Sequence, residues 1–519
     1  MKSILHIRLP AEYERGQIDQ LLVDKFSFKV EPLISEKWTF YDTFDWCLFN
    51  QSLALRHSGQ EIILDHLSDG ESLNGLTYTS SPGFAWDLPE NLLGKRLKSI
   101  IQMRALLPLA EIYTSSKIYR ILNMNDKTVA RLVYTEARTF HPESDPVLAT
   151  YLSLRSVRGY PKYSRKLAKH LGHAGQVTSM IEDLYFSALE QAGQKPGSYS
   201  GKFDLRLKPN KRSDISTKVI LRYLFEIMKA NEAGIRADID TEFLHDYRIA
   251  IRRTRSALSQ IRNVFPAEVT EHFKKEFRTL GQRTNMLRDL DVYLFSENDF
   301  QARLPAAMCE DIVPLFDYLR VRREQALEEV IDSLSSSEYI RMHREWEEFL
   351  NEPISKKTVA ANAAIPIVDL ARKRIYKRYR RVIKDGDYIL THTQDELLHA
   401  LRIECKKLRY LMEFFTSLFP RKRMARLIMQ LKKLQDNLGE FNDLSVQQEY
   451  LMHMAQDLPI DDPGSRKALV ATGYLVENLD YKQKAEKANF AKTFTEFASP
   501  ANQVLFRRLF ATKGKKAAR

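Results

Sequence analysis

The sequence predicts an α+β protein, with an antiparallel β-rich domain at the amino terminus and an all-α domain behind it. Residues 1–200 alternate short apolar runs of strand type with turn clusters, whereas the sequence from Ile215 onward carries long apolar stripes at helical spacing. A stretch rich in Gly, Ser, Pro and Lys separates the two textures. We therefore expect domains over residues 1–195 and 214–519, joined by a linker over residues 196–213.

Several segments of the first domain have the strand pattern, namely SILHIRL, LALRH, EIILDHL, KIYRIL and ARLVYTEAR. Turn clusters such as SPG and MNDK separate them, so we expect a mostly antiparallel sheet. Residues 163–193 return to helical spacing and add helices to this domain. In the second domain the breaks between helical stripes are few and short, which is typical of an α-bundle.

The basic character of the chain belongs to the helical domain. The whole sequence has 80 Lys and Arg against 67 Asp and Glu, a net charge of +13. Residues 1–200 hold 23 basic and 22 acidic side chains, and residues 201–519 hold 57 and 45, so the excess is +1 against +12. We expect a polyanionic partner for the second domain.

Composition also excludes several classes of protein. A hydrophobic content of 44% with 28% charged residues does not fit bulk disorder. Cys47, Cys309 and Cys405 are odd in number and far apart, which fits neither a disulfide framework nor a structural zinc site. The amino terminus lacks a signal-peptide core, and no stretch reaches the ~18 apolar residues of a membrane span. We expect a cytoplasmic protein with no membrane partner.

The helical domain contains an internal repeat at an offset of 154 residues over about fifty positions. Matching amphipathic helices explain repeated leucines, because 154 is a multiple of seven. They do not explain why a His, a series of basic residues, a Phe-Pro pair and an Asp-Leu pair hold the same offset. We infer a duplication, with halves of about 214–355 and 356–519. The matched pairs include His245 with His399, Arg248 with Arg402, Arg252 with Lys406, Arg253 with Lys407, and Arg255 with Arg409.

Each copy carries a stripe of basic residues on one helix face. The stripe of the first copy is His245, Arg248, Arg252 and Arg255, and that of the second is His399, Arg402, Lys406 and Arg409. Cations at this spacing repel one another, and Glu413 is the first acidic residue that could offset them. A solvated basic face is the simpler interpretation of one such helix. Two duplicated stripes favour a shared groove for a linear polyphosphate or a nucleic-acid backbone.

A second basic run, ARKRIYKRYRRVIK over residues 371–384, has eight Lys or Arg and no acid. Its cations either bind anions or form a solvated wrap around an apolar stripe of Ile375, Tyr379 and Val382. We expect no metal at His245 or His399, because neither has further ligands at suitable spacing. Additional candidates for polyanion binding are Lys218, Arg278, Arg372, Arg374, Lys377, Arg381 and Lys432.

These residues resemble the CHAD family, the conserved-histidine α-helical domain. HDYRIAIRRTRSAL and LGQRTNMLRDLDVYL in the first half, and HALRIECKKLRYLMEFF and LKKLQDNLGEFNDLSV in the second, match its two signature blocks over about residues 210–519. The resemblance implies two helical bundles related by a pseudo-two-fold axis, whose basic central surface binds inorganic polyphosphate without catalysis. It implies as ligand-facing residues His245, Arg248, Arg252, Arg253, Arg255, His399, Arg402, Lys406, Lys407 and Arg409. Asp289 and Asp443 are interpreted as structural, holding helix starts or orienting arginines.

The first domain looks like the CYTH superfamily, the triphosphate tunnel fold, in residues 39–57, 117–138 and 152–171. That family opens on an ExExK strand whose carboxylates hold a divalent metal, but this chain has Lys2, Ile4 and His6 there. Without those carboxylates we expect no triphosphatase activity, no catalytic residue and no cofactor. A basic interior could still form from Arg56, Lys117, Arg120, Arg131 and Arg155.

The leading hypothesis is therefore a non-enzymatic protein that binds inorganic polyphosphate and associates with polyphosphate granules. One alternative is a metal-dependent triphosphatase acting through the first domain. Another is RNA or DNA binding by the basic helices, which the scarcity of aromatic residues along the stripes disfavours.

Overall fold

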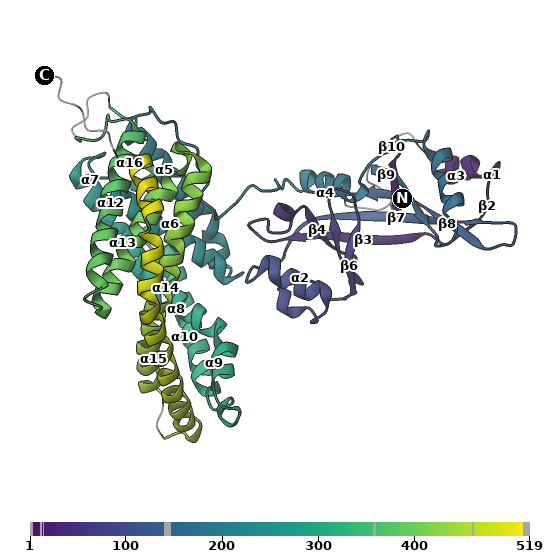
Figure 1. Cartoon of the computed structure of the whole chain (residues 1–519). Coiled ribbons are helices and arrows are strands. Elements are labelled where there is room, and N and C mark those ends of the chain that lie inside the picture. Colours follow the sequence, from purple (N-terminus) through teal and green to yellow (C-terminus); the bar gives the residue numbers. More distant parts are fainter. Residues whose placement is uncertain are drawn as a thin grey trace. The chain divides into compact units, whose positions relative to one another are not determined.

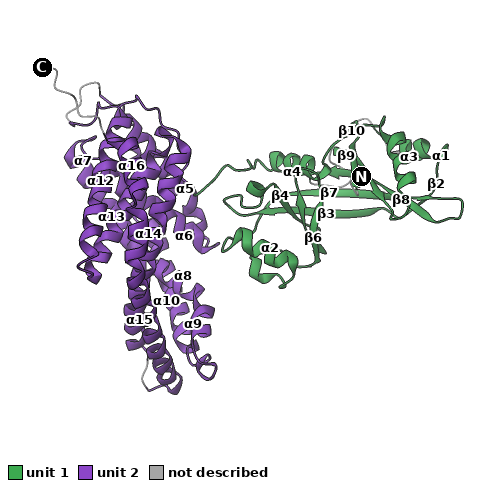
Figure 2. Ribbon diagram, viewed as in Figure 1, with its two compact units in different colours: residues 1–201 green, residues 202–519 purple. Residues whose placement is uncertain are grey.

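The structure is a computed structural model, and it describes residues 4–10, 13, 15–139, 147–355, 360–458 and 461–511. The chain divides into two compact units, residues 1–201 and residues 202–519 (Figure 2). The first unit is an antiparallel β-sheet with helices, and the second is entirely helical (Figure 1). The predicted fold class is confirmed.

The described strands of the first unit form one antiparallel sheet of 10 strands; nine follow the order β10-β1-β9-β8-β7-β3-β4-β5-β6, and β2 pairs with β7 outside this order. The long strand β7 pairs with β8 along one edge, and β3 and then β2 share its other edge. The strands are β1 (Ile4–Arg8), β2 (Ser27–Val30), β3 (Ile34–Asp42), β4 (Leu53–His57), β5 (Glu61–His66), β6 (Ser72–Thr77), β7 (Leu107–Leu122), β8 (Thr128–Arg138), β9 (Val147–Ser156) and β10 (Gln176–Val177).

This sheet curls into a half-barrel. Strands β4 and β9 are four steps apart in the sheet, which would separate them by roughly 19 Å if it were flat. The charge of Arg56 on β4 nevertheless contributes to lowering the pKa of Arg155 on β9, after burial itself. The two strands must therefore curve toward each other. A half-barrel is compatible with the tunnel-like domain that the sequence suggested.

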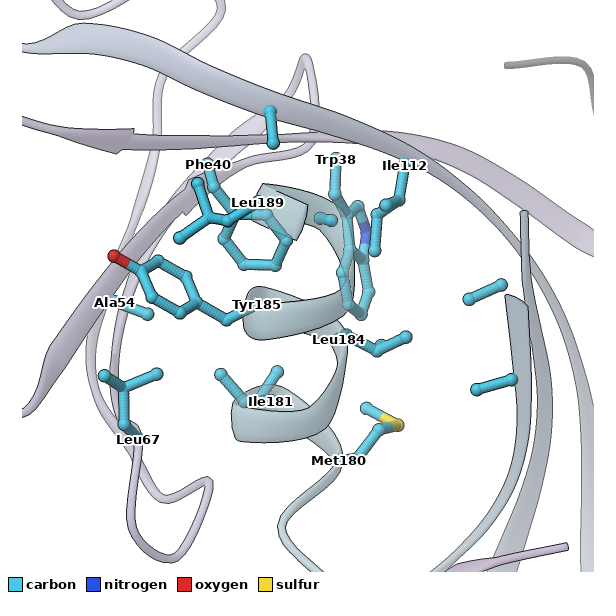
Figure 3. Close-up of a cluster of buried hydrophobic side chains, with 14 of the residues drawn as sticks. Trp38, Phe40, Ala54, Leu67, Ile112, Met180, Ile181, Leu184, Tyr185 and Leu189 are labelled. Atoms are coloured by element: carbon cyan, nitrogen blue, oxygen red, sulfur yellow. The ribbon is translucent and has the colours of Figure 1, made fainter. Parts of the chain in front are cut away.

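Helices cover both faces of the curled sheet, and successive residues of β9, which point to opposite faces, are therefore buried. The four helices of the unit are α1 (Arg15–Val23), α2 (Leu92–Ile101), α3 (Pro161–Leu171) and α4 (Met180–Gln191). The side chains of α1 and α3 pack on one face. Helix α4 packs on the other, where Leu184 and Tyr185 lie against Trp38, Phe40 and Ile112 (Figure 3).

The second unit consists of helices throughout its described residues. They are α5 (Ser213–Arg236), α6 (Thr241–Gln260), α7 (Ala267–Arg283), α8 (Asn285–Phe295), α9 (Glu297–Arg303), α10 (Val313–Ser335), α11 (Ser337–Asn351), α12 (Ile367–Ile389), α13 (Asp395–Phe414), α14 (Arg421–Gln456), α15 (Pro463–Phe497) and α16 (Pro500–Phe510). None of the described helices is long and apolar enough to cross a membrane.

Helix boundaries repeat at the offset seen in the sequence. The pairs α5 and α12, α6 and α13, and α7 and α14 begin at residues 213 and 367, 241 and 395, and 267 and 421, which are each 154 apart. The two copies also meet symmetrically. The backbone N–H of Ser213 donates to the carbonyl of Ile365, and that of Ile367 donates to the carbonyl of Lys211. Equivalent residues thus exchange hydrogen bonds, as a pseudo-two-fold axis requires.

The expected linker is only partly a linker. Its later residues, from Lys202, belong to the helical unit. Leu207 is buried, its backbone N–H donates to the Ser417 hydroxyl, and the Phe203 ring packs edge-on against Phe414. A composition rich in Gly, Ser and Lys does not reveal such anchoring contacts, because they depend on helices far along the chain.

Close packing in the second bundle makes one glycine hard to replace. A Cβ atom at Gly386 of α12 would lie within van der Waals overlap of the Phe494 ring of α15, whereas one at Gly473 of α15 would meet nothing within 4 Å. We expect Gly386→Ala to lower the free energy of unfolding by about 1–3 kcal/mol. Gly473→Ala should raise it by about 0.5–1 kcal/mol, because alanine is the better helix former. Urea unfolding of both variants tests this, and equal effects would contradict the packing.

Candidate functional site

Helices α6 and α13 carry the two basic stripes and contact each other within the bundle. Asp240 caps α6 by accepting from the backbone N–H groups of Glu242 and Phe243. Helix α13 begins with Asp395 and Glu396, whose charges suit a helix amino terminus. Each helix buries an apolar face, and the residues of its basic stripe are half-buried or exposed.

One ion pair ties the two helices together. Arg253 of α6 donates to Glu413 of α13 at 3.2 Å, and Arg409 of α13 donates to the other oxygen of the same carboxylate at 2.8 Å. The Arg253 and Glu413 side chains are only 12% and 19% exposed. Glu413, which the sequence suggested as an internal partner, therefore balances one cation from each half.

Beside this ion pair lies a pocket of about 390 Å³, which brings the two stripes together. Arg252 of the first stripe lines it with Arg402, Lys406 and Arg409 of the second. Helix α14 forms the opposite wall and contributes carboxylates as well as neutral groups. The remaining lining residues are Tyr410, Gln435, Asp436, Gly439, Glu440 and Asp443.

Lys406 and Arg402 of this pocket are partly buried, whereas Arg252 is exposed. Burial, followed by the charges of Arg402 and Arg252, lowers the pKa of the Lys406 ammonium to about 8. Burial also lowers the pKa of Arg402, with Asp443 acting in the opposite direction. Among the described residues, neither Arg252 nor Lys406 takes part in an ion pair. An anion in the pocket would relieve this uncompensated charge.

Side chains of α14 orient the second stripe. The Arg402 guanidinium donates to the Asp443 carboxylate at 2.7 Å, and His399 Nδ1 lies 2.5 Å from Asn442 Oδ1. Asp443 lies in the middle of α14 and Asp289 in the middle of α8, so neither holds a helix start. Asp443 instead orients an arginine, which was the other structural role predicted for these aspartates.

The first stripe is used differently. Arg248 donates to the Gly281 carbonyl, the Thr284 hydroxyl and the Asn285 side chain, so its guanidinium is held at the junction of α7 and α8. Burial lowers its pKa to about 10. Arg255 is half-buried, and Arg278 contributes to lowering its pKa, after burial. His245 lies on α6 before this group and is half-buried. None of these residues lines the described pocket of Arg252.

Lys407 and the cations of α12 lie outside that pocket. Lys407 donates to Glu404, and Arg378 pairs with the same carboxylate. Arg381 lies 3.6 Å from Glu404 as well. The apolar stripe predicted on α12 is confirmed, since Ile375, Tyr379 and Val382 are buried. Three further cations lie on α12. Arg372 pairs with Asp369, and Arg374 donates to the Arg262 carbonyl. Lys377 is exposed.

Two other candidates lie in different places. Lys218 is buried, and its ammonium donates to the backbone carbonyls of Phe349 and Glu352 at the end of α11. It therefore satisfies helix carbonyls, and this position does not bring it to the pocket. Lys432 is exposed on α14 but does not line the pocket either. Sequence spacing alone could not separate these lysines from the pocket cations.

Gln435 is the main pocket residue that the stripe pattern missed. It is 7% exposed, and its Oε1 accepts from Arg409 at 3.2 Å. The matching residue in the first copy of the repeat is Gly281, so the repeat gave no reason to select Gln435. The sequence features that could have pointed to Gln435 are this difference between the two copies and the nearby acidic residues Asp436 and Glu440.

The cations predicted for the interior of the first unit mostly have partners there. Arg56 donates to buried Asp65 at 2.7 Å and stacks over Trp38, and Lys117 and Arg120 lie 3.7 Å from Asp19 and 3.9 Å from Glu31. Arg131 and Arg155 are neighbours on β8 and β9.

Two of the three positions aligned with the metal-binding strand lie on β1. Ile4 is half-buried there, and the buried His6 ring lies 2.6 Å from the Ser153 hydroxyl. Lys2 lies outside the described residues. No group of three or more His, Cys, Asp or Glu that could hold a metal occurs among the residues that the structure describes.

In comparison with known protein families, residues 219–452 match the model of the CHAD domain. Two uncharacterized proteins from strains of Mycobacterium tuberculosis are 23% identical over 297 residues, which is 54% of this chain and 55% of each relative. The chain thus spans about half the length of the curated relatives it matches.

Solved structures with a similar arrangement include the CHAD domain from the plant Ricinus communis, with a TM-score of 0.48, 23% identity, and coverage of 56% of this chain and 95% of that chain. They also include PptA from Streptomyces chartreusis, with a TM-score of 0.44, 17% identity, and coverage of 55% and 99%.

The shared role of Glu413 can be tested by stability. We expect Glu413→Gln to lower the free energy of unfolding by about 1–3 kcal/mol, because Arg253 and Arg409 both lose a charged acceptor. Glu440→Gln, at an exposed carboxylate of the same region, should change it by less than about 0.5 kcal/mol. Urea unfolding measures both, and similar values would show that the shared ion pair does not stabilise the helix contact.

Proposed function

With a CHAD domain matched at residues 219–452, we propose that this protein binds inorganic polyphosphate through the pocket between α6, α13 and α14 and does not transform it. The observation that carries the proposal is the meeting of Arg252 with Arg402, Lys406 and Arg409 around one pocket. Guanidinium and ammonium groups are the side chains best suited to phosphate oxygens.

The energetics of the free pocket support an anionic ligand. Burial and mutual repulsion disfavour the charged form of Lys406, and a phosphate chain would supply the missing counter-charge. Tyr410 is the one aromatic side chain among the lining residues identified, which offers little for base stacking. A phosphate chain without bases therefore fits this pocket better than a nucleic acid.

We further propose that the first unit is not a triphosphatase. Ile4 and His6 supply no carboxylate on β1, and α4 packs apolar side chains onto the curled sheet. The ligand would be met on polyphosphate granules in the cytoplasm. Release of orthophosphate from tripolyphosphate with magnesium or manganese would contradict the non-catalytic assignment.

Removing the pocket cations should abolish binding. For the triple variant Arg252→Ala, Arg402→Ala and Lys406→Ala, we expect affinity for long-chain polyphosphate to fall at least about 100-fold at moderate salt. The slope of log affinity against log salt should decrease by about 2, because roughly three phosphate contacts are lost. Isothermal titration at several salt concentrations measures both quantities.

A control with the same loss of charge is available on α15. Arg466, Lys467 and Lys482 are exposed there and do not line the pocket. Their triple alanine variant should keep most of the affinity, since only long-range attraction is reduced. Equal losses in both triple variants would show that net charge, and not this pocket, determines binding. Stronger competition by tRNA than by polyphosphate at matched phosphate would favour a nucleic-acid ligand.

The low pKa of Lys406 predicts how binding depends on pH. The ligand favours the protonated amine, so affinity should fall by about tenfold from pH 7 to pH 9. The charged or titratable groups around it are Arg252 on α6, Arg402, Arg409 and Tyr410 on α13, and Asp436, Glu440 and Asp443 on α14. The Lys406→Arg variant keeps its positive charge and should bind polyphosphate with equal affinity at pH 7 and pH 9. If the affinity of this variant still falls tenfold, a group other than Lys406 causes the pH dependence.

A further inference from the structure

The pocket between α6, α13 and α14 has two walls of opposite charge. Arg252, Arg402, Lys406 and Arg409 form the cationic wall on α6 and α13. The α14 wall carries Asp436, Glu440 and Asp443, whose spacing of four and then three residues puts them on one helix face. Asp443 pairs with Arg402, but no ion pair of Asp436 or Glu440 is found in the described part of the chain.

On the α14 wall, Gln435 has a hydrogen-bond donor without an acceptor. Its Oε1 accepts from Arg409, which leaves the carboxamide nitrogen directed elsewhere. That nitrogen is buried and has no hydrogen-bond partner among the described residues. An unpaired buried donor costs about 1–3 kcal/mol, so such a group points to an acceptor supplied by a ligand.

The inner units of a phosphate chain do not suit the carboxylate wall. They are fully ionised and carry no donor, so Asp436 and Glu440 repel them. The end unit is different, because its second ionisation lies near pH 6, as in phosphate monoesters. It can accept from the cations and from Gln435, and it can donate a P–OH hydrogen bond to a carboxylate.

We propose that this pocket binds the terminal phosphate of a phosphate chain, with the Gln435 carboxamide nitrogen donating to it and the α14 carboxylates accepting from its P–OH group. This inference rests on the proposed function and specifies which part of the ligand the pocket holds. A volume of about 390 Å³ is small for a binding site and suits a chain end better than a long stretch of chain.

The first copy of the repeat has no equivalent pocket chemistry. Gln435, Asp436 and Glu440 correspond to Gly281, Gln282 and Met286, so the donor and two of the carboxylates are missing there. We therefore expect the end-binding pocket in the second copy of the repeat and not at the matching positions of the first.

The proposal can be tested with a linear phosphate chain, which has terminal phosphates, and a cyclic one, which has none. Linear tetraphosphate has two ends, whereas cyclic hexametaphosphate has none and a similar charge. We expect the full-length protein to bind the linear ligand about tenfold more tightly at pH 6, where about half of the chain ends keep their P–OH group, in isothermal titration at fixed salt. Pyrophosphate, which consists of two end units, should compete with the linear ligand for the same site.

Variants of α14 assign the preference to this pocket. Gln435→Leu should weaken the linear ligand about tenfold and leave the cyclic one unchanged, and retained cyclic binding also shows that the variant is folded. Gln430→Leu, at a half-buried glutamine of α14 outside the pocket, should have no effect. Glu440→Gln should strengthen the cyclic ligand, because it removes a repulsive charge.

The possible failures are distinct. Equal affinity of the native protein for linear and cyclic ligands overturns end binding but leaves polyphosphate binding intact. A preference for linear ligand that persists in Gln435→Leu overturns the role of Gln435. If long-chain polyphosphate, the linear and the cyclic ligands all fail to bind, the proposed function itself is wrong.

Discussion

The helical unit depends on one electrostatic constraint, which is that cations from both halves meet where α6 contacts α13. Like charges at such a contact would push the helices apart unless carboxylates balanced them. Glu413 balances Arg253 and Arg409, and Glu404 and Asp443 neutralise further cations around the contact. The compensation is incomplete at Arg252 and Lys406, and those are the cations that line the pocket. The cations with an internal carboxylate partner therefore hold the helix contact together, and those without one are the cations to which we assign the proposed anion binding.

The sequence predicts the fold class and the offset between the two copies, because periodicity and the repeat are visible in the sequence itself, but of the first stripe only Arg252 lines the described pocket. Helix starts obey the same offset of 154 residues, and Arg252 does meet Arg402, Lys406 and Arg409. It does not predict which cations turn inward. Lys406 and Lys407 are adjacent in sequence, yet one lines the pocket and the other donates to Glu404, since successive helix positions differ by about 100°. Lys218 and Gln435 depend on partners from other helices, which no single stripe reveals.

The two halves have diverged around a common plan. In the first copy the backbone breaks at Thr284, between α7 and α8, and Arg248 fills the junction with three hydrogen bonds. In the second copy the matching position is Leu438, a buried residue within the continuous helix α14. Arg402, the counterpart of Arg248, is thereby released from a backbone role and pairs with Asp443 beside the pocket. A difference in helix continuity thus converts a structural arginine into a pocket arginine.

In the first unit, apolar packing occupies the sheet face that also carries arginine side chains. Helix α4 places Leu184 and Tyr185 against Trp38 and Phe40 of the curled sheet, and burying side chains of this size stabilises a domain by about 1.5–3 kcal/mol each. That packing lies on the sheet face to which Arg56 also belongs, since Ala54 and Arg56 alternate with residues of the other face of β4. The Arg56 guanidinium is itself held by buried Asp65 and the Trp38 ring. Helix α4 thus fills part of this face and Asp65 already balances Arg56, but Arg131 and Arg155 are neighbours on the same face, and the charges of Arg56 and Arg131 contribute, after burial, to lowering the pKa of Arg155. The cations of this face are therefore crowded by an apolar helix, whereas Arg252 and Lys406 of the helical unit line an open pocket.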